Sequence, residues 1–436
     1  MSRILAHAVF VLAFVAMNLL FKRPEFWSYL PLFGLMFASS LLIYKQSKDA
    51  LINSLILAFM LRMIALVIMP WLSDDFYRFH WDGLLWTHGI NPLSVLPNEL
   101  ITGDFDLKGI NQTLFQLLNS PDKYSVYPPI AQLVFGISAF LFPEDLFYSS
   151  FTMKLFLVAA EFGLVYYALR LLSHYKLPKE LVLLIVWNPL FLIETHINLH
   201  FEVIMLCFSL GTIYYLLKSK LRFAALFFAL ACLTKLLPLI FLPLILLKIK
   251  RTSFEFLLIS SLIGIIGFTP LFLNSQALLS FESIKLYFVV FEFNAGLYYL
   301  LSHLGSLLVG YNPIAILGPS MAVISFFMIL LISWRYRKKQ LAEGFLMILC
   351  CYLIFSTTVH PWYIMSLIVF GIFSKLRFWI LWSFTAFLSY SAYTSEIVSQ
   401  NFWLIALEYL SLLGFLIWEF RFIGRSSADS VPADIS

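Results

Sequence analysis

The sequence predicts an all-α protein, a polytopic bundle of transmembrane helices. Two features of its composition support this, since 61% of the 436 residues are apolar and only 12% are charged. A soluble domain carries roughly 25% charged residues, so a soluble chain of this composition could not cover its own surface. The third feature is a series of apolar runs near the roughly 20 residues of one bilayer crossing, which predicts about 12–14 spans. A soluble enzyme, a coiled coil, a disordered scaffold and a nucleic-acid binder are excluded.

The apolar runs give the predicted spans in order along the chain. Each is expected to be a helix, because a spanning segment must satisfy its backbone groups internally. The run 361–374 is short and is expected to be tilted or partial. The run 221–247 has basic residues at both ends and is expected to form a helical hairpin with its apex near Lys235. The other spans are 4–20, 27–44, 51–72, 151–172, 180–196, 200–217, 254–273, 314–334, 341–358, 378–394 and 401–420.

Basic residues orient these spans, because loops rich in Lys and Arg stay in the cytoplasm. An N-terminus inside places every basic cluster in the cytoplasm, provided that residues 73–150 stay outside. The apolar piece Tyr127 to Phe142 is then expected to be a helix in the outer interface. We therefore expect one domain over 1–424 in the inner (cytoplasmic) membrane, with both termini cytoplasmic. Its outer loops are 73–150 and 274–313, and 425–436 is a cytoplasmic tail.

Polar residues that are hard to explain structurally gather on the outer side under this topology. Lys235 is the clearest case, since a charge at membrane depth is costly and usually faces a cavity or a partner. Others have structural explanations when taken singly: Asp74 and Asp75 suit a helix N-terminus, and Arg78 suits lipid headgroups. The set comprises Asp74, Asp75, Tyr77, Arg78, Asp82 and Tyr127 in the first outer loop, Glu194, His200 and Glu202 around the next outer turn, Lys235, Asn294, and His360, Trp362 and Tyr363.

This combination of side chains suits sugar transfer from a lipid-borne phosphate to a hydroxyl group. A carboxylate can take the acceptor proton as the new bond forms, and a cation can neutralise the departing phosphate. Aromatic faces can stack on sugar rings, and an apolar groove must hold the lipid tail. His196 and His200 could form half of a metal site with nearby carboxylates, but polar capping of a tight turn is favoured. We expect no cofactor; the sequence assigns no metal ligands, and metal dependence stays open.

The polar groups form an ordered series of motifs that resembles the GT-C superfamily of polytopic glycosyltransferases. The likeness is to bacterial mannosyltransferase-like members that use polyprenyl-phosphate-linked sugars. The resemblance implies a catalytic first outer loop whose acidic residue is the general base, a role that falls on Asp74 or Asp75. It also implies inversion at the anomeric carbon, and relatives often have Asp where this chain has Glu202. The motifs are Asp74-Asp75-Phe76-Tyr77-Arg78-Phe79-His80-Trp81-Asp82-Gly83, His88-Gly89-Ile90-Asn91-Pro92, Ser125-Val126-Tyr127-Pro128-Pro129, Asn188-Pro189-Leu190 with Glu194, Asn198-Leu199-His200-Phe201-Glu202, Thr234-Lys235 with Pro238, Phe293-Asn294 and His360-Pro361-Trp362-Tyr363.

Two other function classes remain open at this point. A transporter or flippase of lipid-linked saccharides would place its polar residues near the midplane, often in related halves, and no such repeat is found. An outer-face glycan ligase or a non-catalytic assembly subunit is the other alternative. The acceptor stays open among a lipid-linked glycan, a glycolipid and a protein hydroxyl, and the sugar among mannose, another hexose and a pentose. Arg62, Glu161 and Glu408 are interpreted as interhelical polar contacts outside the site.

Overall fold

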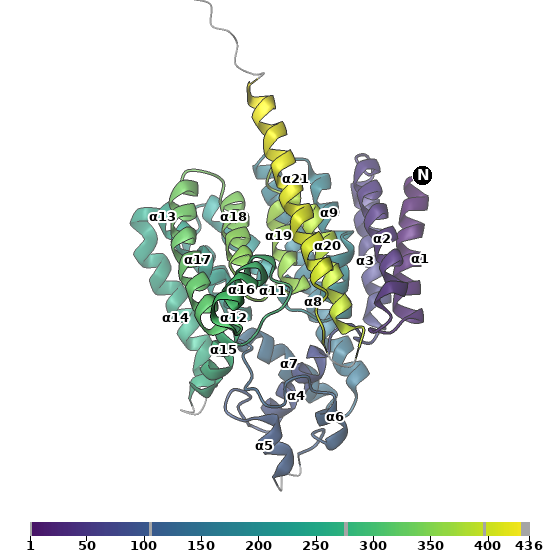
Figure 1. The fold of residues 1–436 in the computed structure, drawn as a ribbon, viewed down its shortest axis with the longest axis vertical. Coiled ribbons are helices and arrows are strands. Elements are labelled where there is room, and N and C mark those ends of the chain that lie inside the picture. The colour runs from purple at the N-terminus through teal and green to yellow at the C-terminus, as the bar shows by residue number, and fades with distance from the viewer. Residues whose placement is uncertain (1, 104–106, 274–277, 396–397, 429–436) are drawn as a thin grey trace, which may run out of the picture.

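The protein is a bundle of helices with a smaller helical unit at one end (Figure 1). The computed structural model describes residues 2–103, 107–273, 278–395 and 398–428. Within these ranges the regular structure is helical, with one isolated β-bridge between Phe293 and Thr358. The all-α prediction is confirmed. Residues 104–106 and 274–277 of the two predicted outer loops, and 429–436 of the predicted tail, lie outside the described residues.

Six helices in the described part of the chain are long and apolar enough to cross a membrane, or seven if one bent pair counts as a single span. Other apolar helices are shorter, at 10–17 residues. The chain is therefore a multi-pass membrane protein. The six are α1 (Arg3–Leu20), α2 (Phe26–Gln46), α8 (Leu146–His174), a segment over Leu237–Phe272 that contains α13 and α14, α17 (Ile314–Tyr336) and the part of α21 up to Arg421.

The smaller unit is built from the first predicted outer loop. Its helices are α4 (Asp75–Thr87), α5 (Pro97–Thr102), α6 (Gln112–Gln116) and α7 (Pro129–Leu141). α3 (Leu51–Leu66) precedes it and stops short of the predicted residue 72, because Pro70 cannot continue a helix. α4 and α7 pack closely at Gly83, where a Cβ would lie only 2.2 Å from the carbonyl oxygen of Phe135. This contact fixes α4, and with it the two aspartates at its start. The helix predicted over 127–142 is α7.

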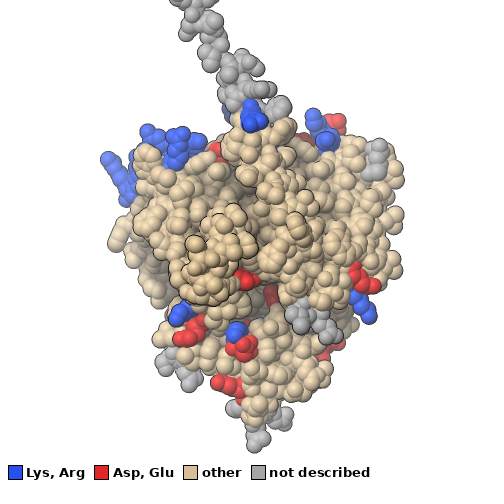
Figure 2. Space-filling view, viewed as in Figure 1, with Lys and Arg blue, Asp and Glu red and all other residues tan. Residues whose placement is uncertain are grey.

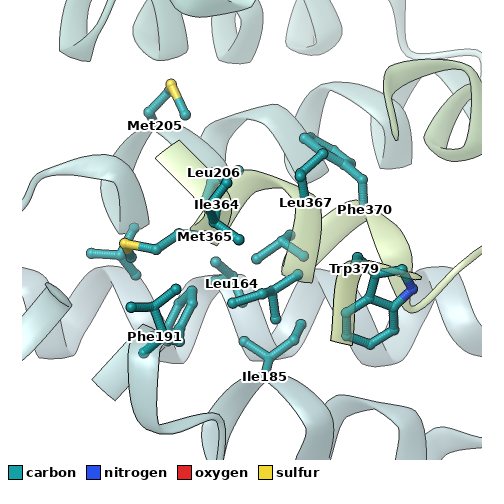
Figure 3. Close-up of a cluster of buried hydrophobic side chains, with 14 of the residues drawn as sticks. Leu164, Ile185, Phe191, Met205, Leu206, Ile364, Met365, Leu367, Phe370 and Trp379 are labelled. Carbon is teal, nitrogen blue, oxygen red and sulfur yellow. The ribbon is translucent and has the colours of Figure 1, made fainter. Parts of the chain in front are cut away.

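The centre of the bundle is a close-packed apolar core (Figure 3). It brings together Leu164 of α8, Phe191 of α10, Leu206 of α11 and Ile364 of α19, all fully buried. A single span predicted over 180–196 is instead a pair of segments bent by 56°, because Pro189 follows Asn188 and cannot extend the preceding helix. The elements are the 3-10 helix η1 (Lys179–Val182), α9 (Leu183–Val186), α10 (Pro189–Leu192), the π-helix η2 (Ile193–Ile197), α11 (Glu202–Leu217), α19 (Ile364–Gly371) and α20 (Phe378–Thr385).

The hairpin predicted over 221–247 is present. α12 (Leu221–Thr234) ends just before Lys235, and the chain returns through the 3-10 helix η3 (Leu237–Phe241) and α13 (Leu242–Ile249). After the short 3-10 helix η4 (Lys250–Thr252), α14 (Ser253–Phe272) runs beside α12. A salt bridge of 3.2 Å between Arg222 and Glu255 joins the starts of α12 and α14. Lys235 therefore lies at the opposite end of α12, as predicted.

The C-terminal part departs from the predicted boundaries in three places. The predicted outer loop 274–313 contains two helices, α15 (Ser280–Val289) and α16 (Gly296–Val309). The predicted span 378–394 is α20 followed by the 3-10 helix η7 (Ala386–Tyr393). α21 (Phe402–Ala428) continues past the predicted tail boundary at 425. The remaining elements are α18 (Leu341–Ile354) and the 3-10 helix η6 (Pro361–Tyr363).

Charged side chains are distributed unequally along the bundle (Figure 2). Lys and Arg predominate at the end where α1 begins and α21 ends, whereas Asp and Glu gather around the α4–α7 unit. A hollow between this unit and the bundle exposes acidic side chains.

Candidate active site

The two aspartates at the start of α4 have different partners. The Asp74 carboxylate accepts a hydrogen bond of 2.6 Å from Arg23, whose guanidinium lies 4.5 Å from the centre of the Tyr393 ring. The Asp75 carboxylate instead accepts a hydrogen bond of 2.7 Å from the Asn119 side chain. Asp74 is therefore held in an ion pair, whereas Asp75 carries no salt bridge in the described part of the chain.

The surroundings of Asp75 change the pKa of its carboxyl group. Burial raises its pKa above the ordinary value, and the negative charge of Asp74 raises it further. The Asn119 hydrogen bond and the nearby charges of Lys235 and Arg23 lower it in part. A carboxylate with a raised pKa is a stronger base than an ordinary aspartate when it is ionised, which suits proton abstraction.

A second carboxylate, Glu194, is held by the bend between α9 and α11. The Asn188 side chain caps the backbone N–H groups of Leu190 and Phe191, and the helix then widens into the π-helix that carries Glu194. Glu194 accepts hydrogen bonds from the Tyr390 hydroxyl at 2.8 Å and from the Asn198 amide at 3.0 Å. π-Helical turns are rare and frequently lie at functional sites.

Glu202 and Lys235 form a salt bridge near Asp75 and Glu194. Lys235 follows the last residue of α12 in an extended conformation, and its ammonium group donates a hydrogen bond to Glu202. The Lys235 side chain is 21% exposed, whereas Glu202 is 2% exposed. Since the charges of Lys235 and Glu202 both lie close enough to interact with Asp75, the pair faces the start of α4.

Four rings form a continuous stack along one side of the cluster that contains Asp75, Glu194, Glu202 and Lys235. His200 lies 3.9 Å from Trp362, Trp362 lies 4.1 Å from His360, and the next ring, Phe293, lies 4.8 Å from His360. Backbone hydrogen bonds of Phe293 to Thr357 and Val359 hold the last ring in place. Burial and the charge of Lys235 lower the pKa of His200, and the same causes lower that of His360 to about 3, so both rings are neutral at pH 7.

Buried polar atoms without a hydrogen-bond partner concentrate in this region. Such atoms are rare in folded proteins and call for an explanation, for example a ligand or a water molecule. Within the described residues, the segment 195–202 alone supplies five of them. They are Thr195 Oγ1, His196 Nδ1, Asn198 Oδ1, His200 Nε2 and Glu202 Oε2, and His360 Nδ1 lies in the same cluster. The segment 195–202 thus concentrates buried donors and acceptors whose hydrogen-bonding capacity is not used within the described part of the protein.

Comparison with known families identifies the family of this chain. Residues 8–251 match the family model described as Alpha-(1->6)-mannopyranosyltransferase, N-terminal domain. The match covers more than half of the chain. The chain belongs to this mannosyltransferase family. No curated protein matches it. The enzyme is therefore a membrane glycosyltransferase of the GT-C type, and the resemblance found in the sequence is confirmed.

The match includes most of the candidate cluster of the mannosyltransferase. Asp74, Asp75, Glu194, Glu202 and Lys235 all lie within residues 8–251. His360, Trp362 and Tyr363 lie beyond it, yet the ring stack brings them to the same place.

Other predicted site residues of the mannosyltransferase lie apart from this cluster or have internal partners. Arg78 is buried and donates to Asp82 at 2.8 Å and to the carbonyls of Ser120 and Lys123. Asp82 also accepts from Ser125 and Gln132. These contacts hold the α4–α7 unit together, and one terminal guanidinium nitrogen of Arg78 remains without a hydrogen-bond partner among the described residues.

Three more predicted residues contact neighbours within the protein. Tyr127 packs edge-on against Phe79 and Phe135. Asn294 donates to Glu408 of α21 at 3.1 Å. Tyr77 lies in the first turn of α4, where its N–H donates to the Asp74 carbonyl.

Residues that the sequence interpretation missed complete the cluster of the mannosyltransferase. Arg23 pairs with Asp74, Asn119 holds Asp75, and Tyr390 holds Glu194. Arg23 did carry a signal, because it lies at the end of a predicted span opposite to the end where the other basic clusters lie, and a basic residue there opposes the usual charge bias and needs an acidic partner. Asn119 and Tyr390 lie far from their partners in sequence, and no local pattern marks them.

An apolar cavity of about 640 Å³ lies between the α4–α7 unit and the bundle. Its walls come from α4, α7, α12 and α14, and its residues include Trp86, Leu133, Phe140, Leu233 and Leu271. Leu133 and Phe140 are 61% and 74% exposed, so the cavity is open at the surface of the protein. Leu233 precedes Lys235 by two residues, which places the cationic end of the α12 turn near one end of the cavity.

Proposed function

We propose that this mannosyltransferase transfers a mannosyl group from a polyprenyl-phosphate-linked donor to a hydroxyl acceptor, with inversion and with Asp75 as the general base. The observation that carries the proposal is that the Asp75 carboxylate lies within electrostatic reach of the Lys235–Glu202 pair, and that Leu233, two residues before Lys235, lines an apolar cavity. A base, a cation and an apolar groove are the parts that this reaction needs. The acceptor is a glycan, a glycolipid or a protein hydroxyl.

The proposed step needs one proton transfer and one displacement. Asp75 removes the proton from the acceptor hydroxyl while the acceptor oxygen attacks the anomeric carbon. The bond between that carbon and the phosphate oxygen breaks, and its electron pair leaves with the polyprenyl phosphate. Attack from the face opposite the leaving group inverts the configuration. The Lys235 ammonium neutralises the phosphate by charge-assisted hydrogen bonds, and the neutral rings of His200 and His360 can donate further ones.

Asp74 has a positioning role in this proposal. Its ion pair with Arg23 ties the start of α4 to the α1–α2 connection. Its negative charge raises the pKa of Asp75. Glu194, fixed by Tyr390 and Asn198, lies close enough to Asp75 and Glu202 to interact electrostatically with both. Glu194 is suited to bind hydroxyl groups of the sugar. Arg78 and Asp82 support the unit that carries Asp75.

The proposed orientation follows the charge distribution. The basic end of the bundle faces the cytoplasm and holds both termini, so α4–α7 and the cluster lie on the outer side of the inner membrane. The 640 Å³ cavity would then receive the lipid tail of the donor from the outer leaflet.

Single substitutions in the purified protein test the base assignment. With a polyprenyl-phosphate mannose donor, Asp75→Asn should lower kcat by about 10²–10⁴-fold, the usual contribution of a general base. Asp74→Asn should retain more activity, because its role is indirect. Asp122→Asn is the matched control, since Asp122 lies in the same loop, is 59% exposed and pairs only with Lys123 among the described residues. Undiminished transfer by Asp75→Asn would refute the assignment.

A further inference from the structure

A second cavity, of about 540 Å³, lies between α1 and α3. Its α1 residues include Arg3, His7 and Val11, in the first half of that helix, which begins at the end of the bundle away from the α4–α7 unit (Figure 1). Its sides are apolar and open, since Ile4, Met60 and Ile64 line it and are 78%, 59% and 40% exposed. Trp187 is fully buried at its inner wall. The cavity is therefore a lateral groove between two helices rather than a part of the candidate active site.

One end of this groove is polar and organised. Arg3 and His7 lie in the first two turns of α1, and Asn53 and Ser54 lie in the first turn of α3. The His7 ring and the Ser54 hydroxyl are hydrogen-bonded at 3.0 Å. Trp187 donates from its indole nitrogen to the same hydroxyl at 3.1 Å. Since His7 and Ser54 are 7% and 1% exposed, this polar end is held by the interior of the bundle.

The polar end of the groove carries uncompensated positive charge. Arg3 is the first residue of α1, where its charge adds to the positive end of the helix dipole instead of offsetting it. No salt bridge joins Arg3 to an acid in the described part of the chain, and no acidic side chain lines the groove. The connection before α3 adds exposed Lys45 and Lys48 against one acid, Asp49. The groove thus combines an apolar channel with a cationic end.

We propose that this groove binds a phospholipid with an anionic headgroup. The phosphate would lie against Arg3 at the N-terminal ends of α1 and α3, and an acyl chain would follow the apolar walls past Leu57 and Ile64. A neutral or zwitterionic lipid would leave the Arg3 charge uncompensated, whereas an anion offsets it. The site is independent of the active-site cluster and of the donor cavity.

Native mass spectrometry of the full-length protein in detergent tests the proposal with two probes, phosphatidylglycerol and phosphatidylcholine. The wild type should retain one phosphatidylglycerol in preference to phosphatidylcholine. Arg3→Gln should weaken phosphatidylglycerol binding about fivefold, the factor equivalent to about 1 kcal/mol for one basic residue near an anionic lipid. Leu57→Trp fills the channel and should weaken both lipids. Arg335→Gln and Leu155→Trp are matched controls, an exposed arginine and an exposed leucine outside the groove.

Thermal unfolding and basal mannosyl transfer show that the variants are folded, because none of these residues lies in the active-site cluster. Loss of the preference in Arg3→Gln but not in Arg335→Gln supports the site. Equal retention of the two lipids by the wild type would overturn it, and so would equal losses in the Arg3 and Arg335 variants. Protection from unfolding by inorganic phosphate alone, equal to that by the lipid, would show an anion site without a lipid channel and would also refute the proposal.

Discussion

Replacement of Lys235 by Met tests whether this cation acts on the departing phosphate or only balances Glu202. Met keeps the length and much of the apolar stem of Lys but removes the charge. The double variant Lys235→Met/Glu202→Gln removes both charges of the pair. If Lys235 only balances Glu202, neutralising Glu202 as well should restore activity. If Lys235 acts on the departing phosphate, the double variant should stay inactive.

The structure gives a magnitude for each role. Two unit charges about 4 Å apart interact by about 4 kcal/mol at an effective dielectric constant of about 20. Lys235 is 21% exposed, so water weakens this interaction. We therefore expect loss of this cation to lower kcat by a factor near the lower end of the range of about 10²–10³ that a single preorganised donor contributes. Glu202 is 2% exposed, and a buried charge without its partner costs about 3–5 kcal/mol of folding stability.

Transfer assays and thermal unfolding on the same preparations separate the two effects. Lys235→Met should lose about 100-fold in kcat and also unfold at a lower temperature. The double variant should recover most of the stability but none of the activity, and Lys235→Arg should retain part of both. Recovery of transfer by the double variant would refute the phosphate role, as would a Lys235→Met enzyme within a few-fold of the wild type.

Three further predictions follow from the pKa shift of Asp75, the donor cavity and the buried charges. The raised pKa of Asp75 places the acid limb of the kcat/KM profile above pH 3.8, and activity is lost as the pH falls through this limb. Arg23→Gln removes a positive charge that lowers this pKa, so the variant should move the limb to higher pH. Leu133→Trp narrows the donor cavity and should raise KM about 10-fold for a long polyprenyl donor, but not for a donor with a short chain. Glu161→Gln leaves the buried Arg62 unpaired and should destabilise the fold by about 3–5 kcal/mol, measured by thermal unfolding, with Arg62→Met/Glu161→Gln less affected. An unshifted pH profile of Arg23→Gln would contradict the first expectation. Equal changes of KM for the long and the short donor would contradict the second, and a double variant as unstable as Glu161→Gln would contradict the third.

Most of the helical architecture could be predicted from the apolar runs, because length and composition decide whether a segment can cross a membrane. The details that failed depend on single residues or on tertiary contacts. Pro70 ends α3 early, and Pro189 divides one predicted span into two. α15 and α16 lie in a segment that was interpreted as a loop, since neither is long enough to give a span signal. Boundaries of this kind follow from packing more than from local pattern.

The sequence marks the charged residues of the candidate site, whereas the residues that support them carry no such mark. Lys235 and Glu202 were singled out because charge is rare in this chain, and the structure brings them together. Arg78 and Asp82 were singled out for the same reason, yet they pair with each other inside the α4–α7 unit. An i to i+4 spacing on one helix face allows such a pair, and this spacing could have indicated it.

The buried ion pair of Arg62 and Glu161 has a consequence for the synthesis of the chain. Arg62 lies in α3 and donates to Glu161 of α8 at 2.7 and 3.1 Å, with both side chains fully buried. The two residues are 99 positions apart, so at about 5–20 residues per second Glu161 is made roughly 5–20 s after Arg62. During that interval Arg62, near the C-terminal end of α3, has no Glu161 to pair with, and an arginine at the centre of a spanning helix opposes insertion by about 2.5–3.5 kcal/mol. The whole of α4–α7 is made in the same interval. Arg62 of α3 therefore gains its buried ion partner only after the unit that carries the aspartates has been synthesised.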